Sequence, residues 1–203
     1  MSTSNPAIIH AFWRVLATTG WQALTMRDIA AEAGISLAEL RRQHACPLDI
    51  LEVHEREVDA LVLDGTVPDP GSTARDRLFD VLMRRIDALQ PHRAGVVRLM
   101  RDLPRSPGLA LWCAGRSGQA MAWMLEAAGL DAAGTKGALR VQGLGVVWLA
   151  TLRAWEKEES EDLSATMAAL DRALDQADRI ARWFRMAPVE SAPVDAEPAP
   201  EPV

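Results

Sequence analysis

The chain has 203 residues, of which 49% are hydrophobic, and its formal net charge at pH 7 is −6. This length is enough for one domain with a full hydrophobic core, with or without a small second module. The acidic balance argues against broad, nonspecific attraction to nucleic acid, although a local basic face can exist on an acidic protein. The two cysteines, Cys46 and Cys113, are far apart and form no C-x-x-C pair, so neither a disulfide framework nor a cysteine zinc site is indicated.

The sequence contains no signal for export or membrane insertion. Its start, MSTSNPAII, lacks the basic and apolar regions of a signal peptide. No apolar run reaches the roughly 18 residues that a spanning helix needs. We therefore expect a cytoplasmic protein with at most peripheral contact with a membrane.

The first predicted helix follows Asn5, which can act as a cap, and Pro6, which suits the first helical position. Apolar residues recur on one face of this segment until Gly20 ends it. The chain therefore opens with an amphipathic helix.

Two short helices joined by a tight turn are predicted next. Thr25 and Asp28 resemble a capping box, and Gly34 stops the helix that they open. Ser36 and Glu39 repeat the capping pattern, so a third helix starts only two residues after the glycine. This arrangement is typical of a helix-turn-helix.

A fourth helix is predicted from about Pro47 to Leu63, and the two prolines and two glycines of residues 64–72 then interrupt the pattern. We expect a helix-turn-helix module with its connecting helix in residues 1–63 and a helical bundle in residues 73–186. Residues 187–203 combine repeated proline with acids and are predicted to be disordered.

The second module is also predicted to be helical throughout. Apolar periodicity marks a helix that ends before Pro91 and another that reaches Leu103. Three longer helices follow, over residues 109–128, 136–156 and 163–185. The predicted fold class is all-α, with about nine helices.

Nothing in the sequence favours an enzyme. The four histidines lie on different predicted helices without metal-ligand spacing, and no nucleophile elbow or phosphate-binding glycine loop is present. The acidic stretch EKEESED is more typical of a solvated turn than of a catalytic carboxylate pair. We expect no catalytic residue, no metal and no cofactor.

The segment TMRDIAAEAGIS, residues 25–36, and the order of helices and caps resemble the N-terminal module of the TetR family of transcriptional regulators over residues 6–52. The resemblance implies a TetR-like fold whose third helix enters the major groove of DNA. Family members typically have a leucine, a tyrosine, a further aromatic residue and a lysine where this chain has Leu40, Arg41, His44 and Pro47. If DNA binding is retained, the residues that we expect at the interface are Thr25, Arg27, Ser36, Arg41, Arg42 and His44.

The charge of this module leaves its role open. Residues 1–56 contain five arginines and six acids, a net charge of −1, whereas affinity for DNA comes largely from cations that displace counterions. Arg41 and Arg42 can compensate, because arginine contacts phosphates and reads guanine well. A helix-turn-helix retained only for packing is equally compatible with the sequence.

The second module resembles the C-terminal domain of the lipid-binding accessory proteins of coenzyme Q (ubiquinone) biosynthesis over residues 75–180. The resemblance lies in the segments RDRLFDVLMRRIDALQPHR and MAWMLEAAG and in a third region with Arg140, Thr151, Trp155 and SEDLSATMAALD. It implies a homodimer that holds an isoprenoid or quinone-like lipid in an apolar chamber and presents it to a partner hydroxylase.

The sequence also offers residues that could line such a chamber. The helix around residues 141–152 is apolar on nearly all sides, so we expect it to be central in the bundle. Tryptophan and methionine supply broad, polarizable surfaces, although the same side chains commonly form ordinary core. The predicted ligand-binding residues are Trp112, Met121, Trp123, Met124, Gln142, Trp148 and Thr151.

One feature departs from the coenzyme Q accessory proteins. Those proteins carry an additional membrane-contacting helix, whereas here the last predicted helix is followed by the acidic tail. The arginines beside Trp183 and Phe184 could form a small interfacial anchor, although an ordinary helix end explains them equally well.

The sequence thus predicts a non-enzymatic, homodimeric protein that binds a hydrophobic small molecule or lipid, with a role as an accessory protein of ubiquinone biosynthesis as the leading hypothesis. The alternative is a ligand-responsive transcriptional regulator that binds DNA.

Overall fold

The computed structural model describes residues 5–67 and 71–186. Within these ranges the chain forms nine α-helices and no strand, which confirms the predicted all-α class. The α-helices are α1 (Pro6–Thr19), α2 (Met26–Ala33), α3 (Leu37–Gln43), α4 (Pro47–Asp64), α5 (Ala74–Leu89), α6 (Arg93–Asp102), α7 (Pro107–Ala127), α8 (Gly134–Glu156) and α9 (Ser164–Met186). Short 3₁₀ turns occur at Trp21–Ala23, Gln90–His92 and Leu103–Arg105.

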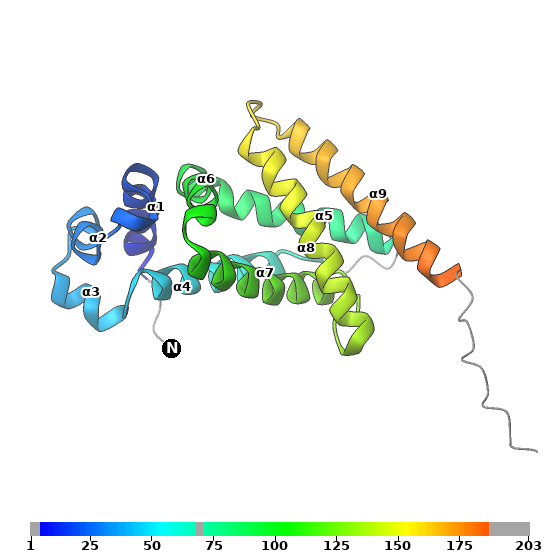
Figure 1. Cartoon of the computed structure of the whole chain (residues 1–203), viewed down its shortest axis with the longest axis horizontal. Helices are drawn as coiled ribbons and strands as arrows, with labels where there is room; N and C mark the ends of the chain where they lie inside the picture. The colour runs from blue at the N-terminus through cyan, green and yellow to red at the C-terminus, as the bar shows by residue number, and fades with distance from the viewer. Residues whose placement is uncertain (1–4, 68–70, 187–203) are drawn as a thin grey trace, which may run out of the picture.

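The helices are arranged along one long axis (Figure 1). Helices α1, α2 and α3 gather at one end, and α5, α8 and α9 lie at the other. Helix α4 leads away from α3 and packs against α5 and α7, while α6 packs against α1. The helix-turn-helix end is therefore held to the bundle by two helix contacts, α4 on one side and α1 with α6 on the other.

Local sequence explains where α1 begins and ends. The Asn5 side chain accepts a hydrogen bond of 3.1 Å from the backbone amide of Ala7, and Pro6 occupies the first turn. Gly20 follows the helix with a positive φ of 78°. A side chain at Gly20 would also meet the Arg98 guanidinium of α6, because a Cβ built there lies 2.2 Å from Nη2.

The hydrophobic core runs without interruption from the helix-turn-helix end into the bundle. Phe12 and Leu16 of α1 are completely buried, as is Trp155 of α8. Helices α1 and α6 approach so closely that a Cβ at Gly95 would lie 2.7 Å from the Trp13 ring. Because the core is shared, a displacement in the bundle can reach the helix-turn-helix by packing alone.

Helix α8 was predicted to be central because it is apolar on nearly all sides, and this prediction is only partly right. Trp148 and Leu144 are buried, but Val146 is 71% and Leu139 74% exposed. Leu149 shares the exposed side at 44%. The reason is that α8 packs on α7 and α9, which leaves one apolar face of the helix uncovered in the single chain.

Two predictions fall on parts of the chain outside the described residues. They are the disordered tail of residues 187–203 and the interfacial anchor formed by the side chains of Trp183, Phe184 and the adjacent arginines. Among the described residues, no helix is both long and apolar enough to span a bilayer.

Candidate functional site

The helix-turn-helix is fixed by the caps that the sequence predicts. The Thr25 hydroxyl accepts the Asp28 backbone amide at 3.2 Å and donates to the Asp28 carboxylate at 2.6 Å. Gly34 ends α2 in the left-handed conformation, with φ 69°. The Ser36 hydroxyl then accepts the Glu39 amide at 3.1 Å, so α3 begins at once. The tight turn sets the relative orientation of α2 and α3.

One side of this unit is anchored in the core. Ile29 and Ala30 of α2 and Leu40 of α3 are buried. Leu40 is completely buried, as its expected packing role requires. With this side of each helix held against α1, the opposite side faces solvent.

The solvent side carries three arginines without ion-pair partners. Arg27 of α2 and Arg41 and Arg42 of α3 are exposed, and none of them forms a salt bridge with any residue that the structure describes. Arginines in this state are available to phosphate oxygens or to guanine edges. Thr25 and Ser36, also expected at the interface, lie exposed at the N-termini of the two helices.

The acids that cancel these charges in the sequence count are engaged elsewhere. Glu32 forms an ion pair of 2.7 Å with Arg14 of α1. Glu52 and Glu55 of α4 pair with arginines of α7 and α5, on the side of α4 that faces the bundle. The net charge of −1 therefore combines two separate surfaces, and it understates the positive charge around α3.

His44 does not lie where the sequence placed it. Its side chain is only 4% exposed, so it offers no surface to a phosphate. Its Nδ1 atom lies 3.6 Å from a carboxylate oxygen of Asp49, beyond hydrogen-bond distance. The same oxygen accepts the Ala45 amide at 2.9 Å. His44 occupies the inward position of the family's aromatic residue and packs in the same way.

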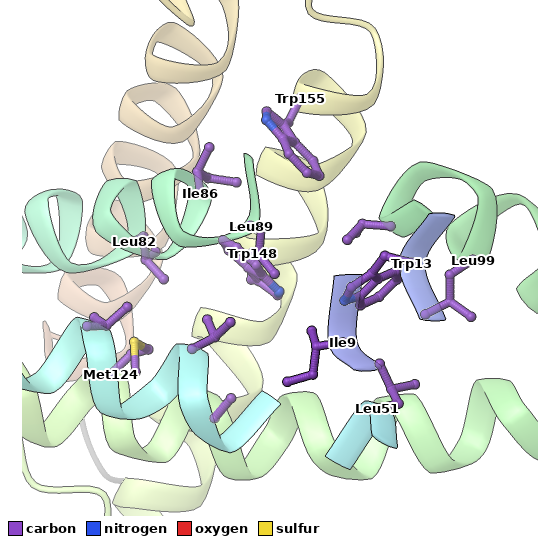
Figure 2. Packing of buried hydrophobic residues seen from close by; sticks show 14 of the residues in the cluster. Ile9, Trp13, Leu51, Leu82, Ile86, Leu89, Leu99, Met124, Trp148 and Trp155 are labelled. Atoms are coloured by element: carbon purple, nitrogen blue, oxygen red, sulfur yellow. The ribbon is translucent and has the colours of Figure 1, made fainter. Parts of the chain in front are cut away.

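A pocket of about 100 Å³ lies behind the helix-turn-helix, where α1, α4, α5, α6, α7 and α8 meet. We call it the α4 pocket. Figure 2 shows Trp148 and Leu89 on one side of this region and Trp13 and Leu51 on the other. Its lining residues are Trp13, Leu51, Glu55, Arg85, Leu89, Val96, Leu99, Met100, Leu103, Trp112, Cys113, Arg116, Ser117, Trp148 and Leu152.

The charged wall of the α4 pocket links α4 to the bundle. Arg85 of α5 is 2% exposed and pairs with Glu55 at 2.8 Å and with Asp59, both on α4. Its guanidinium carbon also lies 5.6 Å from the centre of the Trp148 ring. Burial raises the pKa of Glu55, and the positive charge of Arg85 opposes that rise. On the α7 side, Arg116 lies 3.6 Å from Glu52.

The seven predicted ligand-binding residues do not come together in one chamber. Trp112 and Trp148 line the α4 pocket. Met121, Met124 and Thr151 are completely buried core, and the Thr151 hydroxyl donates to the backbone carbonyl of Val147 at 2.9 Å. Two of the seven lie at the surface instead, Trp123 at 55% exposure and Gln142 on the uncovered side of α8.

The sequence analysis missed the charged residues of this pocket. A signal for them was present, because Glu52, Glu55 and Asp59 recur every three or four residues on an otherwise apolar helix and so share one face. Acids on a core-facing side require partners, and an arginine on a neighbouring helix is the usual one.

A second, open pocket of about 170 Å³ lies nearby and is lined in part by His10, His54 and His92. The His54 and His92 rings pack edge to face, with centroids 5.0 Å apart. Burial, with smaller contributions from His92, Arg85 and His10, lowers the pKa of His54 to about 3. Burial, then His10, lowers that of His92 to about 4. No cluster of three or more metal-ligand side chains in the described part of the chain is arranged to hold a metal ion.

Comparisons with known proteins agree with this geometry. The family model described as bacterial regulatory proteins, tetR family, matches residues 8–40. A TetR transcriptional regulator from Nitrosomonas europaea ATCC 19718 superposes with a TM-score of 0.67 at 25% identity, over 86% of this chain and 97% of that one. No curated protein sequence matches the chain.

Two more distant structures share the fold. A TetR transcriptional regulator from Rhodococcus sp. RHA1 has a TM-score of 0.58 at 16% identity, over 85% of this chain and 93% of its own. A second transcriptional regulator from the same strain has a TM-score of 0.54 at 17% identity, over 87% and 97% of the two chains. The chain thus has a TetR-family N-terminal domain at one end of a TetR-like, all-helical fold.

Proposed function

We propose that the protein is a non-enzymatic, ligand-responsive transcriptional regulator that binds DNA as a homodimer. The observation that carries this proposal is the solvent side of α2 and α3, where Arg27, Arg41 and Arg42 are exposed without acidic partners. In a helix-turn-helix of this kind, the second helix lies in the major groove. The alternative of a unit kept only for packing gives no reason for exposed, unpaired cations on that side.

The capped ends of the helices support the same role. Thr25 and Ser36 leave the first turns of α2 and α3 facing solvent, and the amides of a helix N-terminus attract phosphate. Arg41 and Arg42 lie in the last turn of α3 and can reach the backbone or base edges. We therefore assign DNA contacts to Thr25, Arg27, Ser36, Arg41 and Arg42.

The uncovered face of α8 supports a homodimer. Leu139, Val146 and Leu149 recur along this helix on one side and remain exposed in the single chain. An apolar stripe of this kind is typical of a surface that a twofold-related copy covers. A dimer built on the bundle (residues 73–186) would hold two helix-turn-helix modules (residues 1–63) at a fixed separation, as two half-sites on DNA require.

The α4 pocket supports a ligand response. It is lined by α1 and α4 on the helix-turn-helix side and by α5, α7 and α8 on the bundle side, so an occupant contacts both. A ligand that favours one relative position of these helices shifts the separation of the two recognition helices.

The role in ubiquinone biosynthesis has weaker support. Pockets for drug-sized ligands occupy about 300–1,000 Å³, whereas the α4 pocket has about 100 Å³. Five of the seven residues expected to line a lipid chamber lie in the core or at the surface. Nothing in the described residues favours a lipid, a partner hydroxylase or peripheral membrane contact over the regulator.

The proposal is tested by selecting DNA that the purified full chain retains from a random pool and measuring its affinity by fluorescence anisotropy. We expect an enriched, two-half-site sequence and at least tenfold weaker binding by the Arg41→Ala/Arg42→Ala variant. Arg101→Ala is the matched control, because Arg101 lies on α6 and pairs with Glu156 at 2.8 Å. Absence of any enriched sequence, or equal loss in the control, would refute the proposal.

A further inference from the structure

The α4 pocket contains hydrogen-bond donors that the protein does not satisfy. The indole Nε1 of Trp13 and the Nε atoms of Arg85 and Arg116 are buried without an acceptor among the described residues. All three residues line this pocket, and they come from α1, α5 and α7. Buried donors are almost always paired, with protein, water or ligand. Three unpaired donors at one pocket indicate an occupant that supplies acceptor oxygens.

The pocket lining has no surplus of acceptors for them. The Glu55 carboxylate already accepts from Arg85 Nη2 at 2.8 Å. Cys113 offers only a weak thiol acceptor, and burial raises the pKa of that thiol to about 11, so it is uncharged at pH 7. Ordered water can satisfy the donors in the free protein, and a carboxylate can replace it with stronger, charge-assisted hydrogen bonds.

The size and walls of the pocket limit the rest of the occupant. An engineered apolar cavity of about 150 Å³ accepts benzene. The α4 pocket has about 100 Å³ and is partly open to solvent, so it suits one ring with a small head group. Trp112 and Trp148 provide flat apolar walls for a ring. A long isoprenoid chain does not fit.

The two arginines that would hold a carboxylate also tie α4 to the bundle. Arg85 pairs with Glu55 and Asp59, and Arg116 lies 3.6 Å from Glu52. The contact of Arg116 is longer than a hydrogen bond, so this guanidinium is the more available of the two. An anion bound between them competes directly with the acids of α4.

We propose that the α4 pocket binds a compact aromatic carboxylate, which accepts hydrogen bonds from Arg85 and Arg116 and weakens their hold on α4. Since α4 follows directly on α3, this loosening moves the recognition helix. The inference rests on the proposed function for its regulatory consequence, whereas the binding chemistry rests on the pocket alone.

The charges around Glu55 give the binding a pH dependence. The groups that face it are Arg85 of α5, Arg116 and Cys113 of α7, and Asp59 on its own helix. Adding a carboxylate beside these acids favours protonation of Glu55, whose charged form burial already disfavours. Binding of the anion therefore takes up a proton and tightens as the pH falls from 8 to 6.

The test uses the full chain and three probes of one shape: benzoate, neutral benzyl alcohol and cationic benzylamine. Tryptophan fluorescence reports binding, because Trp13, Trp112 and Trp148 line the pocket. We expect benzoate to bind at least tenfold more tightly than either analogue. Arg116→Gln should weaken benzoate at least tenfold, and the matched control Arg101→Gln, on an exposed arginine paired with Glu156, should not.

Several outcomes would overturn this inference. They are equal or tighter binding of benzylamine, unchanged benzoate affinity in Arg116→Gln, benzoate affinity that falls with the pH, or no binding of any probe to the wild type. The probe series on the wild type does not depend on how well a variant folds. DNA affinity measured without probes separates the two proposals: DNA binding with no probe binding refutes only the ligand class, and benzoate binding without DNA binding refutes only the regulator.

Discussion

Acidification should destabilise the protein through His54. This side chain is 4% exposed and packs edge to face against Trp13, with ring centroids 5.2 Å apart. Its Nε2 atom has no hydrogen-bond partner among the described residues. Burial is the main reason that its pKa falls to about 3. His54 is therefore neutral in the folded protein at pH values where an unfolded chain would protonate it.

The expected loss follows from the two pKa values. The unfolded histidine titrates near pH 6.5 and the folded one near 3, so stability is complete above about pH 6.5 and declines as the pH falls towards 3. At pH 5, about 1.5 pH units below the unfolded value, the loss is about 2 kcal/mol at about 1.36 kcal/mol per unit. His92 acts in the same direction, since its pKa is lowered to about 4, but its partial exposure reduces its contribution.

Urea unfolding at pH 7.5 and pH 5.0 measures this effect, with the protein concentration held constant because dimerisation also affects stability. The His54→Phe variant keeps a ring against Trp13 and removes the titrating group. We expect the wild type to lose about 2 kcal/mol more than the variant between the two pH values. If both proteins lose the same amount, the neutral, buried state assigned to His54 is wrong.

Two further substitutions test the packing. Gly95→Ala places a Cβ 2.7 Å from the ring and carbonyl oxygen of Trp13, so thermal or urea unfolding should show a loss of about 1–3 kcal/mol; Gly118→Ala, with nothing within 4 Å, is the control that should not destabilise, and equal effects would contradict the close α1–α6 contact. Val146→Glu should convert a dimer to a monomer in size-exclusion chromatography with light scattering, whereas Leu111→Glu, on an equally exposed leucine of α7, should not; a Val146→Glu variant that remains dimeric would exclude the α8 face as the interface.

Local signals in the sequence predicted the helices well. The caps at Thr25 and Ser36 and the stop at Gly34 are confirmed, because they depend on residues three or four positions apart. The last helix was predicted over residues 163–185 and is Ser164–Met186. The start of α5 was placed too late, since the Thr73 cap, which accepts the Asp76 amide, was not recognised.

The candidate sites depended on contacts that the sequence does not contain. The net charge of the first 56 residues could not show that Glu52 and Glu55 pair with arginines from α7 and α5, 64 and 30 positions further along the chain. Helix α8 is apolar on so many sides that its pattern has no phase, so the exposed position of Gln142 could not be told from a buried one. His44 illustrates the same limit, because only the packing of α3 against α4 shows that it points inward.

The most direct test of the account is the salt dependence of DNA binding. The central claim is that Arg41 and Arg42 act as cations towards DNA despite the acidic composition of the chain. The slope of the logarithm of the association constant against the logarithm of salt concentration should be about 0.9 smaller for each phosphate contact that their replacement by alanine removes. An unchanged slope in the Arg41→Ala/Arg42→Ala variant, or the same change in Arg101→Ala, would contradict the claim.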